Sequence, residues 1–373
     1  MTAPLFLYGA EPSLYTGKIR SYLRKKGIAF QERNAYHPRY KQVMGIVGRN
    51  IIPVIETPEG DIVQDTSEIF DFLEARYPEK SPNRMMVPQG PRQKLVSYIL
   101  ELFGDEGMLK PAMHYRWNFP DDNFPYIFRE FGRASGPQTP MDESAKFAQP
   151  FAGRMQSYLP MLGVSEQTIP LIEDAYMELL GLLNEHFRFH PYFLGGRPTL
   201  GDFGMIAPLY AHLGRDPYPA MQMKKHAPFV ARWVERMNVA DDGMGEFCDM
   251  PREILAGDEI PETLIPVLKL IAQDYFPEVR AVIDGISKVV REENLPAGTP
   301  VIEPTRMNYG AITVPYRGLD IEIGLRQFSQ WMFQRGLKVY QDLEGDDKSS
   351  VDALLKDINA FETYQIRPER WMI

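Results

Sequence analysis

Short apolar runs and helix-spaced apolar positions alternate along the first part of the chain. Apolar residues at helical spacing predict helices over residues 15–27 and 66–77. Short apolar runs bounded by turn residues predict strands. The predicted strands are residues 4–8, 28–30, 51–55 and 61–64. This order, β-α-β followed by a ββ hairpin and a helix, predicts a small α+β domain over residues 1–82.

The later part of the chain has mostly helical spacing. A Pro- and Asn-rich stretch separates it from the first domain, so we expect a helical domain over residues 90–248. Its clearest helix is predicted over residues 172–186, where Leu179 and Leu183 share an apolar face. Segments rich in Pro, Asp and aromatic residues interrupt the spacing, notably over residues 117–126.

The remaining residues, 249–373, are predicted to form a C-terminal extension with apolar stripes of its own. Residues 261–293 and 324–343 have helical spacing. Strand pieces are predicted over residues 307–323, around the Tyr316-Arg317-Gly318 turn. Ser349 and Asp352 predict a capping box that begins the last helix. The predicted fold class is therefore α+β, with a small β element in a mostly helical extension.

Charge and cysteine content exclude several classes of protein. The formal net charge is −9 and the sequence pI about 5.4, which argues against nucleic acid or an anionic membrane as the main partner. No apolar run is long enough to span a bilayer, and the first residues do not resemble a signal peptide. The single cysteine, Cys248, excludes an internal disulfide framework and a cysteine-rich metal site. We expect a cytoplasmic protein that holds no metal.

Pro53 interrupts the strand-like run IIPVI, although proline cannot donate to a strand ladder. Two further stretches are also candidate binding motifs. LYGAEPSLYTGKIR (residues 7–20) places a hydroxyl residue just before a basic helix, and Asp65-Thr66 precedes Ile69 at a helix entrance. Further on, Thr199 and Asp202 form an S/T-x-x-D box within residues 192–209.

Together these motifs resemble those of glutathione transferases over residues 1–245. The resemblance implies a thioredoxin-like first domain that binds glutathione and a helical domain that binds an electrophile. It also implies that Ile52-Pro53 is the family's cis-proline pair, whose preceding backbone pairs with glutathione as an added strand. Glutathione would be a co-substrate, and a homodimer is the expected assembly.

The resemblance implies that Ser13 stabilises the reactive thiolate of glutathione, since a thiolate is the nucleophile and a hydroxyl can donate to it. Tyr8, at the end of the first strand, and Tyr15 are rivals for this role. Tyr15 is expected on the first turn of the helix, as packing or as a wall of the glutathione site. Without a cysteine at position 13, a mixed disulfide with the protein cannot form there. Ser13 also suits a purely structural role as a helix N-cap.

The same resemblance assigns Asp65 and Thr66 to the γ-glutamyl end of glutathione, where a carboxylate meets the ammonium and a helix start meets the carboxylate. Ile51 stands where the family often has Lys or Gln to meet the glycine carboxylate. Arg49, Lys41 and Gln42 are the alternatives for that contact.

Residues 108–117 (MLKPAMHYRW) lie where the family's fourth helix crosses the cleft. The candidate electrophile pocket consists of His114, Tyr115, Arg116 and Trp117, which would suit an acidic aromatic substrate. Packing between the domains is the alternative for these four. The extension is expected to pack on the helical domain and narrow the electrophile pocket.

The function that follows is a glutathione-dependent transferase acting on a hydrophobic electrophile. A non-catalytic binding or assembly protein of the same fold is one alternative, because fold alone does not establish activity. A glutathione-dependent isomerase, dehalogenase or ether-cleaving enzyme is another, because such sites resemble the transferase site.

Overall fold

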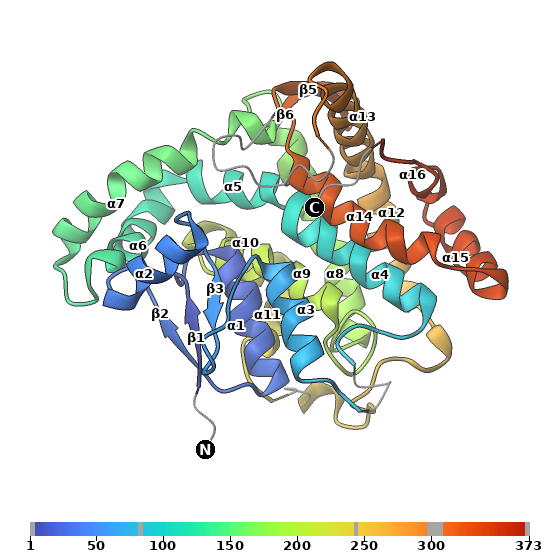
Figure 1. Ribbon diagram of the computed structural model, residues 1–373, viewed down its shortest axis with the longest axis horizontal. Helices are drawn as coiled ribbons and strands as arrows, with labels where there is room; N and C mark the ends of the chain where they lie inside the picture. Colours follow the sequence, from blue (N-terminus) through green and yellow to red (C-terminus); the bar gives the residue numbers. More distant parts are fainter. Residues whose placement is uncertain (1–3, 81–84, 242–244, 297–308, 370–373) are drawn as a thin grey trace.

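A four-stranded sheet begins the fold and lies among the blue elements of Figure 1. The computed structural model describes residues 4–80, 85–241, 245–296 and 309–369. The strand order is β2-β1-β3-β4; β1 pairs parallel with β2, and the other pairs are antiparallel. The strands are β1 (Leu5–Tyr8), β2 (Phe30–Arg33), β3 (Val54–Glu56) and β4 (Ile62–Gln64).

Helices cover both faces of this sheet. Helices α1 (Leu14–Lys26) and α3 (Thr66–Arg76) share one apolar core with Leu5, Leu7 and Ile55, whereas α2 (Pro38–Val47) packs with Tyr8 and Val54. The predicted element order was wrong in omitting α2. Pro38 begins this helix, and Tyr40, Val43 and Met44 form its buried face, a spacing that the sequence already contained.

The helical domain begins with a long helical run across the molecule, drawn in cyan in Figure 1. Its first part, α4 (Pro91–Leu102), continues through a π-helical turn, η2 (Phe103–Gly107), into α5 (Leu109–Trp117). The other helices are α6 (Pro120–Gly132), α7 (Met141–Gln156), α8 (Ile169–Phe189), α9 (Leu200–Ala211), α10 (Pro217–His226) and α11 (Pro228–Met237).

Helix α9 lies at the centre of this domain and crosses the cyan run closely. A Cβ atom on Gly104 would lie 2.3 Å from the backbone of Gly204, so the two glycines permit the crossing. The predicted box at the start of α9 is confirmed, because Thr199 and Asp202 form a reciprocal capping box. Asp202 is fully buried and also accepts a hydrogen bond from Trp233 Nε1 at 3.1 Å.

The extension contains five α-helices among its described residues, and a two-stranded sheet. Its strands, β5 (Ala311–Tyr316) and β6 (Leu319–Gly324), meet at Arg317 and Gly318, both with positive φ, as the predicted turn requires. The expected capping box at Ser349 was wrong, because the helix begins at Gly345 and the Ser349 hydroxyl donates to the Gly345 carbonyl. The helices are α12 (Ile265–Asp274), α13 (Phe276–Glu292), α14 (Gln327–Gln341), α15 (Gly345–Asp357) and α16 (Phe361–Tyr364).

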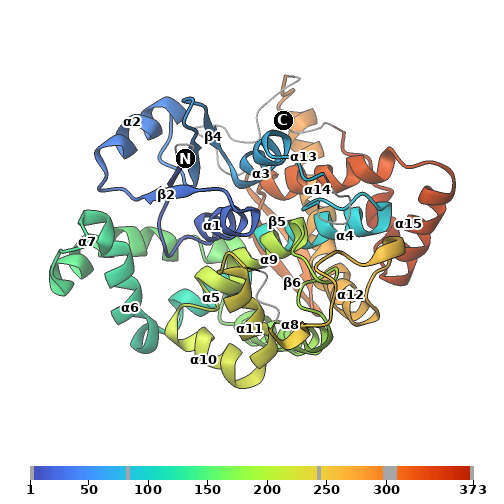
Figure 2. The same cartoon turned by 90° about the horizontal axis from the view of Figure 1, so that it is seen from below.

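Helix α14 lies beside both earlier domains. Figures 1 and 2 show it next to α4 and near α3. Gly336 allows close contact with α4, since a Cβ there would be 3.2 Å from Tyr98 Cβ. Arg335 pairs with Asp71 of α3 at 2.8 Å. The extension therefore contacts the thioredoxin-like domain as well as the helical domain. The predicted α+β class, with its thioredoxin-like and helical parts, is confirmed.

Candidate active site

Ser13 lies at the N-cap of α1, at the end of the loop that follows β1. Its Oγ accepts a hydrogen bond from Thr16 N at 3.3 Å, which fixes the side chain at the helix entrance. Among the described residues, no acceptor takes the Ser13 hydroxyl proton. The hydroxyl is half-buried and can donate to a group placed before the helix.

The Tyr8 hydroxyl is engaged elsewhere. It donates to Glu56 Oε2 at 2.5 Å and accepts from Arg33 Nη1 at 2.9 Å. Burial and the hydrogen bond to Glu56 raise the pKa of Tyr8. Its ring is fully buried on the α2 side of the sheet. The Tyr8 proton is therefore committed to a carboxylate.

Tyr15 lies on the first turn of α1 and reaches the helical domain. Its hydroxyl donates to the Asp105 carbonyl at 3.0 Å. Burial, with the nearby carboxylates of Glu106 and Asp105, raises the pKa of Tyr15 well above its usual value. The ring therefore forms part of a wall at the domain junction, with its proton engaged.

Ile52 and Pro53 precede β3 and are joined by a cis peptide bond. Strand pairing with β1 begins only at Val54, which lies opposite Tyr8. Within the described residues, the N–H and C=O of Ile52 have no hydrogen-bonding partner. Unpaired backbone groups at a sheet edge can accept an added strand.

Asp65 and Thr66 form the entrance to α3. Asp65 Oδ1 accepts from Ser67 N at 2.9 Å and caps the helix, while its backbone has φ +78°, a conformation that non-glycine residues adopt mainly under constraint. Burial raises the pKa of the Asp65 carboxyl, although the Ser67 N–H opposes this. The buried Thr66 hydroxyl and the first N–H groups of α3 lie beside it.

Of the three candidates for the glycine carboxylate, Arg49 lies next to this entrance. Its guanidinium donates to Gln64 Oε1, one residue before Asp65, and the side chain is half-buried. Burial lowers the pKa of Arg49. Lys41 and Gln42 are exposed on α2, where Gln42 accepts from Arg39 at 2.9 Å.

A buried charge cluster that the sequence did not predict supports this entrance from below. Lys18 Nζ of α1 donates to Glu101 Oε1 at 2.9 Å and to Asp105 Oδ2 at 2.5 Å, and all three are buried. The Ser67 hydroxyl lies 3.3 Å from Glu101 Oε1. Burial lowers the pKa of Lys18, but the two carboxylates outweigh it and the pKa rises to about 12. The only signal in the sequence was FGDEG, whose two glycines lie within the π turn.

The four residues expected in the electrophile pocket are packed in the interior of the protein. Arg116 donates twice to Asp216, at 2.6 and 2.9 Å, and once to the Pro12 carbonyl at 2.8 Å. His114, Tyr115 and Trp117 are also buried, at 1–3% exposure. Arg116 therefore connects the loop that carries Ser13 to the helical domain.

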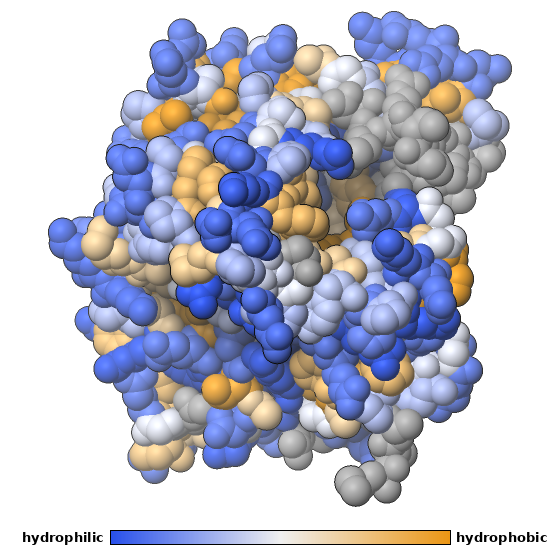
Figure 3. All heavy atoms as spheres, turned by 90° about the vertical axis from the view of Figure 1, so that its left-hand side faces the viewer, coloured by the Kyte–Doolittle hydropathy of each residue, from blue (hydrophilic) through white to orange (hydrophobic). Residues whose placement is uncertain are grey.

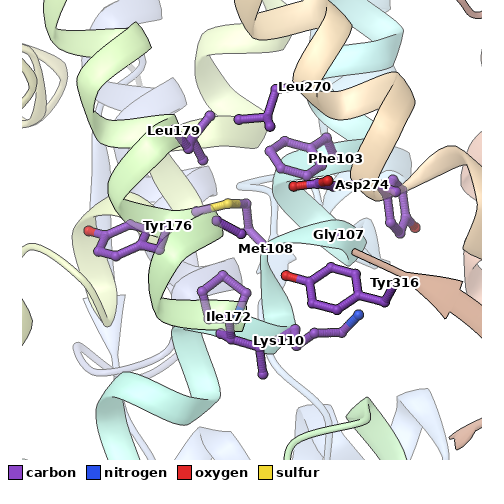
Figure 4. A pocket seen from close by; sticks show the side chains of 13 residues that line it. Phe103, Gly107, Met108, Lys110, Ile172, Tyr176, Leu179, Leu270, Asp274 and Tyr316 are labelled. Carbon is purple, nitrogen blue, oxygen red and sulfur yellow. The ribbon is translucent and has the colours of Figure 1, made fainter. Parts of the chain in front are cut away.

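A cavity of about 40 Å³ lies between α5, α8, α12 and β5. Figure 4 shows Met108, Tyr176 and Tyr316 around it, with Lys110 below Tyr316. This volume suits water molecules, whereas sites for drug-sized ligands measure about 300–1,000 Å³. Through Tyr316 the extension forms one wall of the cavity, which lacks room for such a ligand.

The described residues contain neither a candidate metal site nor a helix that could span a membrane. No group of three or more His, Cys, Asp or Glu side chains there could hold a metal ion. Nor does any helix of these ranges have the length and hydropathy needed to cross a membrane.

Two family models match the chain. Residues 7–81 match the glutathione S-transferase N-terminal domain, and residues 166–236 match the glutathione S-transferase C-terminal domain. The chain therefore contains matches to both domains of glutathione transferases. The first matched region contains Ser13, Ile52, Asp65 and Thr66, whereas α12 to α16 lie outside both matched regions.

Solved structures, among them several glutathione transferases, resemble the chain at low identity. One from Methylobacterium radiotolerans, in complex with glutathione sulfonate, is 19% identical and covers 69% of this chain and 100% of its own (TM-score 0.38). The β-etherase LigF from Sphingobium sp. strain SYK-6 is 18% identical; the match covers 66% of this chain and 99% of the LigF chain (TM-score 0.44). A glutathione transferase from Phanerochaete chrysosporium is 18% identical; the match covers 65% of this chain and 98% of the transferase chain (TM-score 0.42). A search of curated proteins finds no match.

Proposed function

We propose that this protein is a glutathione-dependent transferase in which the Ser13 hydroxyl stabilises the glutathione thiolate. One observation carries the proposal. Of the three candidate hydroxyls, those of Tyr8 and Tyr15 already donate to Glu56 and to the Asp105 carbonyl, whereas the Ser13 proton has no acceptor among the described residues. Ser13 is therefore the hydroxyl that supports donation to a bound sulfur.

The chemistry follows from the position of Ser13 at a helix start. The N-terminus of α1 carries partial positive charge, which favours a thiolate over a thiol. A hydrogen bond from Ser13 would lower the thiol pKa further, and the thiol proton would leave to solvent. The thiolate sulfur then forms a bond to an electrophilic carbon, and the leaving group departs with its electron pair.

The rest of glutathione fits the neighbouring groups. The unpaired backbone of Ile52 is suited to the cysteinyl backbone, and the entrance of α3 at Asp65 and Thr66 to the γ-glutamyl ammonium and carboxylate. The guanidinium of Arg49 is the nearest candidate for a glutathione carboxylate on the β4 side.

We place the electrophile beside α6 and α7. Arg215 donates to the Glu11 carbonyl at 2.8 Å and to the Tyr126 hydroxyl at 2.8 Å, so α6 flanks the loop that carries Ser13. Helix α7 packs on α6 and leaves Phe147 55% and Phe151 43% exposed. Figure 3, seen from the α7 side, shows orange apolar patches on a mostly hydrophilic surface. An apolar surface of this kind suits a hydrophobic electrophile.

The test compares Ser13→Ala with Tyr8→Phe in glutathione binding and in turnover of a generic aromatic electrophile. Ser13→Ala is expected to lower kcat about 10²–10⁴-fold and to raise the pKa of the bound thiol, with glutathione affinity nearly unchanged. The pKa is read from the ultraviolet absorbance of the thiolate against pH. Tyr8→Phe should keep most of the activity. A fully active Ser13→Ala protein, or a wild type that does not bind glutathione, would refute the proposal.

A further inference from the structure

Helix α14 of the extension contacts the first turn of α3, where the γ-glutamyl end of glutathione is proposed to bind. Met332 Sδ lies 3.5 Å from the Ser67 hydroxyl, directly after Thr66. One turn further along both helices, Arg335 donates to the two Asp71 oxygens at 2.8 and 3.2 Å. The extension thus holds α3 at its entrance and again one turn later.

Arg335 also balances the buried charge cluster under this entrance. Glu101 is fully buried; its Oε1 receives Lys18, and its Oε2 lies 3.6 Å from Arg335 Nε. With Arg335 in place, each carboxylate oxygen of Glu101 faces a cation. Without it, Glu101 Oε2 would lie buried with no cation beside it.

That carboxylate would lie next to a site for an anion. Ser67 bonds to Glu101 and belongs to the first turn of α3, whose N–H groups are proposed to bind the γ-glutamyl carboxylate. Negative charge within a few ångströms, in a low dielectric, opposes the binding of a carboxylate. The Arg335 charge therefore favours glutathione without contact to it.

The start of α14 fixes the opposite wall of the site. Arg326 Nη1 donates to Glu106 Oε2 at 2.8 Å, and the Ser329 hydroxyl donates to the same oxygen at 3.2 Å. Glu106 belongs to the π turn whose Asp105 carbonyl accepts the Tyr15 hydroxyl. Helix α14 thus bridges the two sides of the proposed site, α3 on one and η2 with Tyr15 on the other.

We propose that the C-terminal extension is an integral part of the glutathione site, with Arg335 as a positioning residue that couples docking of α14 to glutathione binding. The inference rests on the proposed function. The coupling is reciprocal by thermodynamic linkage: if a docked α14 strengthens glutathione binding, bound glutathione stabilises the docked α14 by the same factor.

The test uses the full-length protein and two readouts. Calorimetry gives the glutathione Kd of the wild type, Arg335→Met, Arg335→Lys and Lys338→Met, a matched control at an exposed position of the same helix. Hydrogen exchange follows the amides of α14 with and without glutathione. We expect Arg335→Met to raise the Kd about tenfold or more, the effect of losing ~1.4 kcal/mol of interaction. Arg335→Lys should restore most of the affinity, and Lys338→Met should match the wild type.

Glutathione is expected to slow amide exchange in α14 of the wild type, a response that a purely stabilising tail would not give. An Arg335→Met Kd within twofold of the wild type overturns this inference alone. If that variant does not fold, unchanged exchange in wild-type α14 overturns it equally. A wild type that does not bind glutathione overturns the proposed function, and this inference with it.

Discussion

Asp105 is a buried carboxylate with one oxygen bound to Lys18 and the other, Oδ1, without a hydrogen-bond donor among the described residues. Burial raises the pKa of Asp105 to about 7, because the attraction of Lys18 is offset by desolvation and by the negative charge of Glu101. The carboxyl therefore holds its proton in the folded protein at pH values where an exposed aspartate is ionised.

This pKa predicts a pH-dependent stability. Between about pH 4 and 7 the unfolded chain has lost the Asp105 proton, whose ordinary pKa is about 3.9, while the folded chain keeps it. The folded state then binds more protons, so the contribution of this group to the free energy of unfolding falls as pH rises through this window. In Asp105→Asn we expect this fall in the free energy of unfolding to be absent. Urea unfolding of the variant and the wild type at several pH values measures the difference.

The control for this experiment is Asp142→Asn, which removes an exposed carboxylate from α7 and should leave the wild-type pH dependence in place. Parallel curves for the wild type and Asp105→Asn would show that Asp105 is ionised throughout the window.

Individual residues of the site differed in how far the sequence could predict them. Ser13 and Asp65 are recognisable in the sequence as helix N-caps, because each precedes apolar residues at helical spacing. Both are N-caps in the structure. Nothing in the sequence brings Lys18 to Glu101, because that pairing depends on how α1 packs against α4. The sequence also did not show that the Tyr8 proton is already donated, because its acceptor, Glu56, lies in another strand.

At the scale of elements, α5 holds the loop that carries Ser13 through a single buried guanidinium. Arg116 binds the Asp216 carboxylate, the Pro12 carbonyl and the Ala211 carbonyl, and all of these contacts lie in the interior. The polar heads of the segment over residues 108–117 suggested a pocket. Which face of that helix is buried depends on neighbours that the sequence does not specify.

Arg116→Met is therefore expected to reduce stability more than substrate affinity. Removing one partner of a buried ion pair costs about 3–5 kcal/mol, because the Asp216 carboxylate would remain buried without compensation. Urea unfolding measures this loss, and Arg129→Met, at an exposed position of α6, serves as the control with an unchanged midpoint. If Arg116→Met keeps wild-type stability and only raises the KM for an acidic electrophile, the residue lines a pocket after all.

Elements with a local signal were predicted well. The β5–β6 hairpin follows from its Arg317-Gly318 turn, and the start of α9 follows from its box. The start of α15 was misplaced at Ser349 because a Ser-x-x-Asp pattern also occurs inside helices, where the hydroxyl can donate to the carbonyl four residues earlier.

At the scale of the whole molecule, polar contacts cross all three junctions between the three parts. Lys18 joins the thioredoxin-like domain to the helical domain, and Arg335 and Arg326 join the extension to each of them. When one part unfolds, the charged groups of the other parts lose their ion-pair partners, so the parts are destabilised together. We expect one cooperative unfolding transition for the full chain.

Scanning calorimetry checks this expectation. The ratio of the calorimetric to the van't Hoff enthalpy should be close to unity, as for a single cooperative unit. A separate transition at lower temperature, accompanied by loss of helical circular dichroism equal to that of α12 to α16, would show that the extension unfolds by itself.

The position of α14 against α3 and α4 has a consequence for biosynthesis. A ribosome releases the chain from its N-terminus at ~5–20 residues per second, so α3 and α4 emerge on the order of ten seconds or more before α14 follows. During that interval the face later covered by Met332 and Gly336 remains open, and Glu101 lacks its second cation. The nascent protein would therefore expose an unfinished surface until α14 has been translated, which makes that face a natural place for a chaperone to bind.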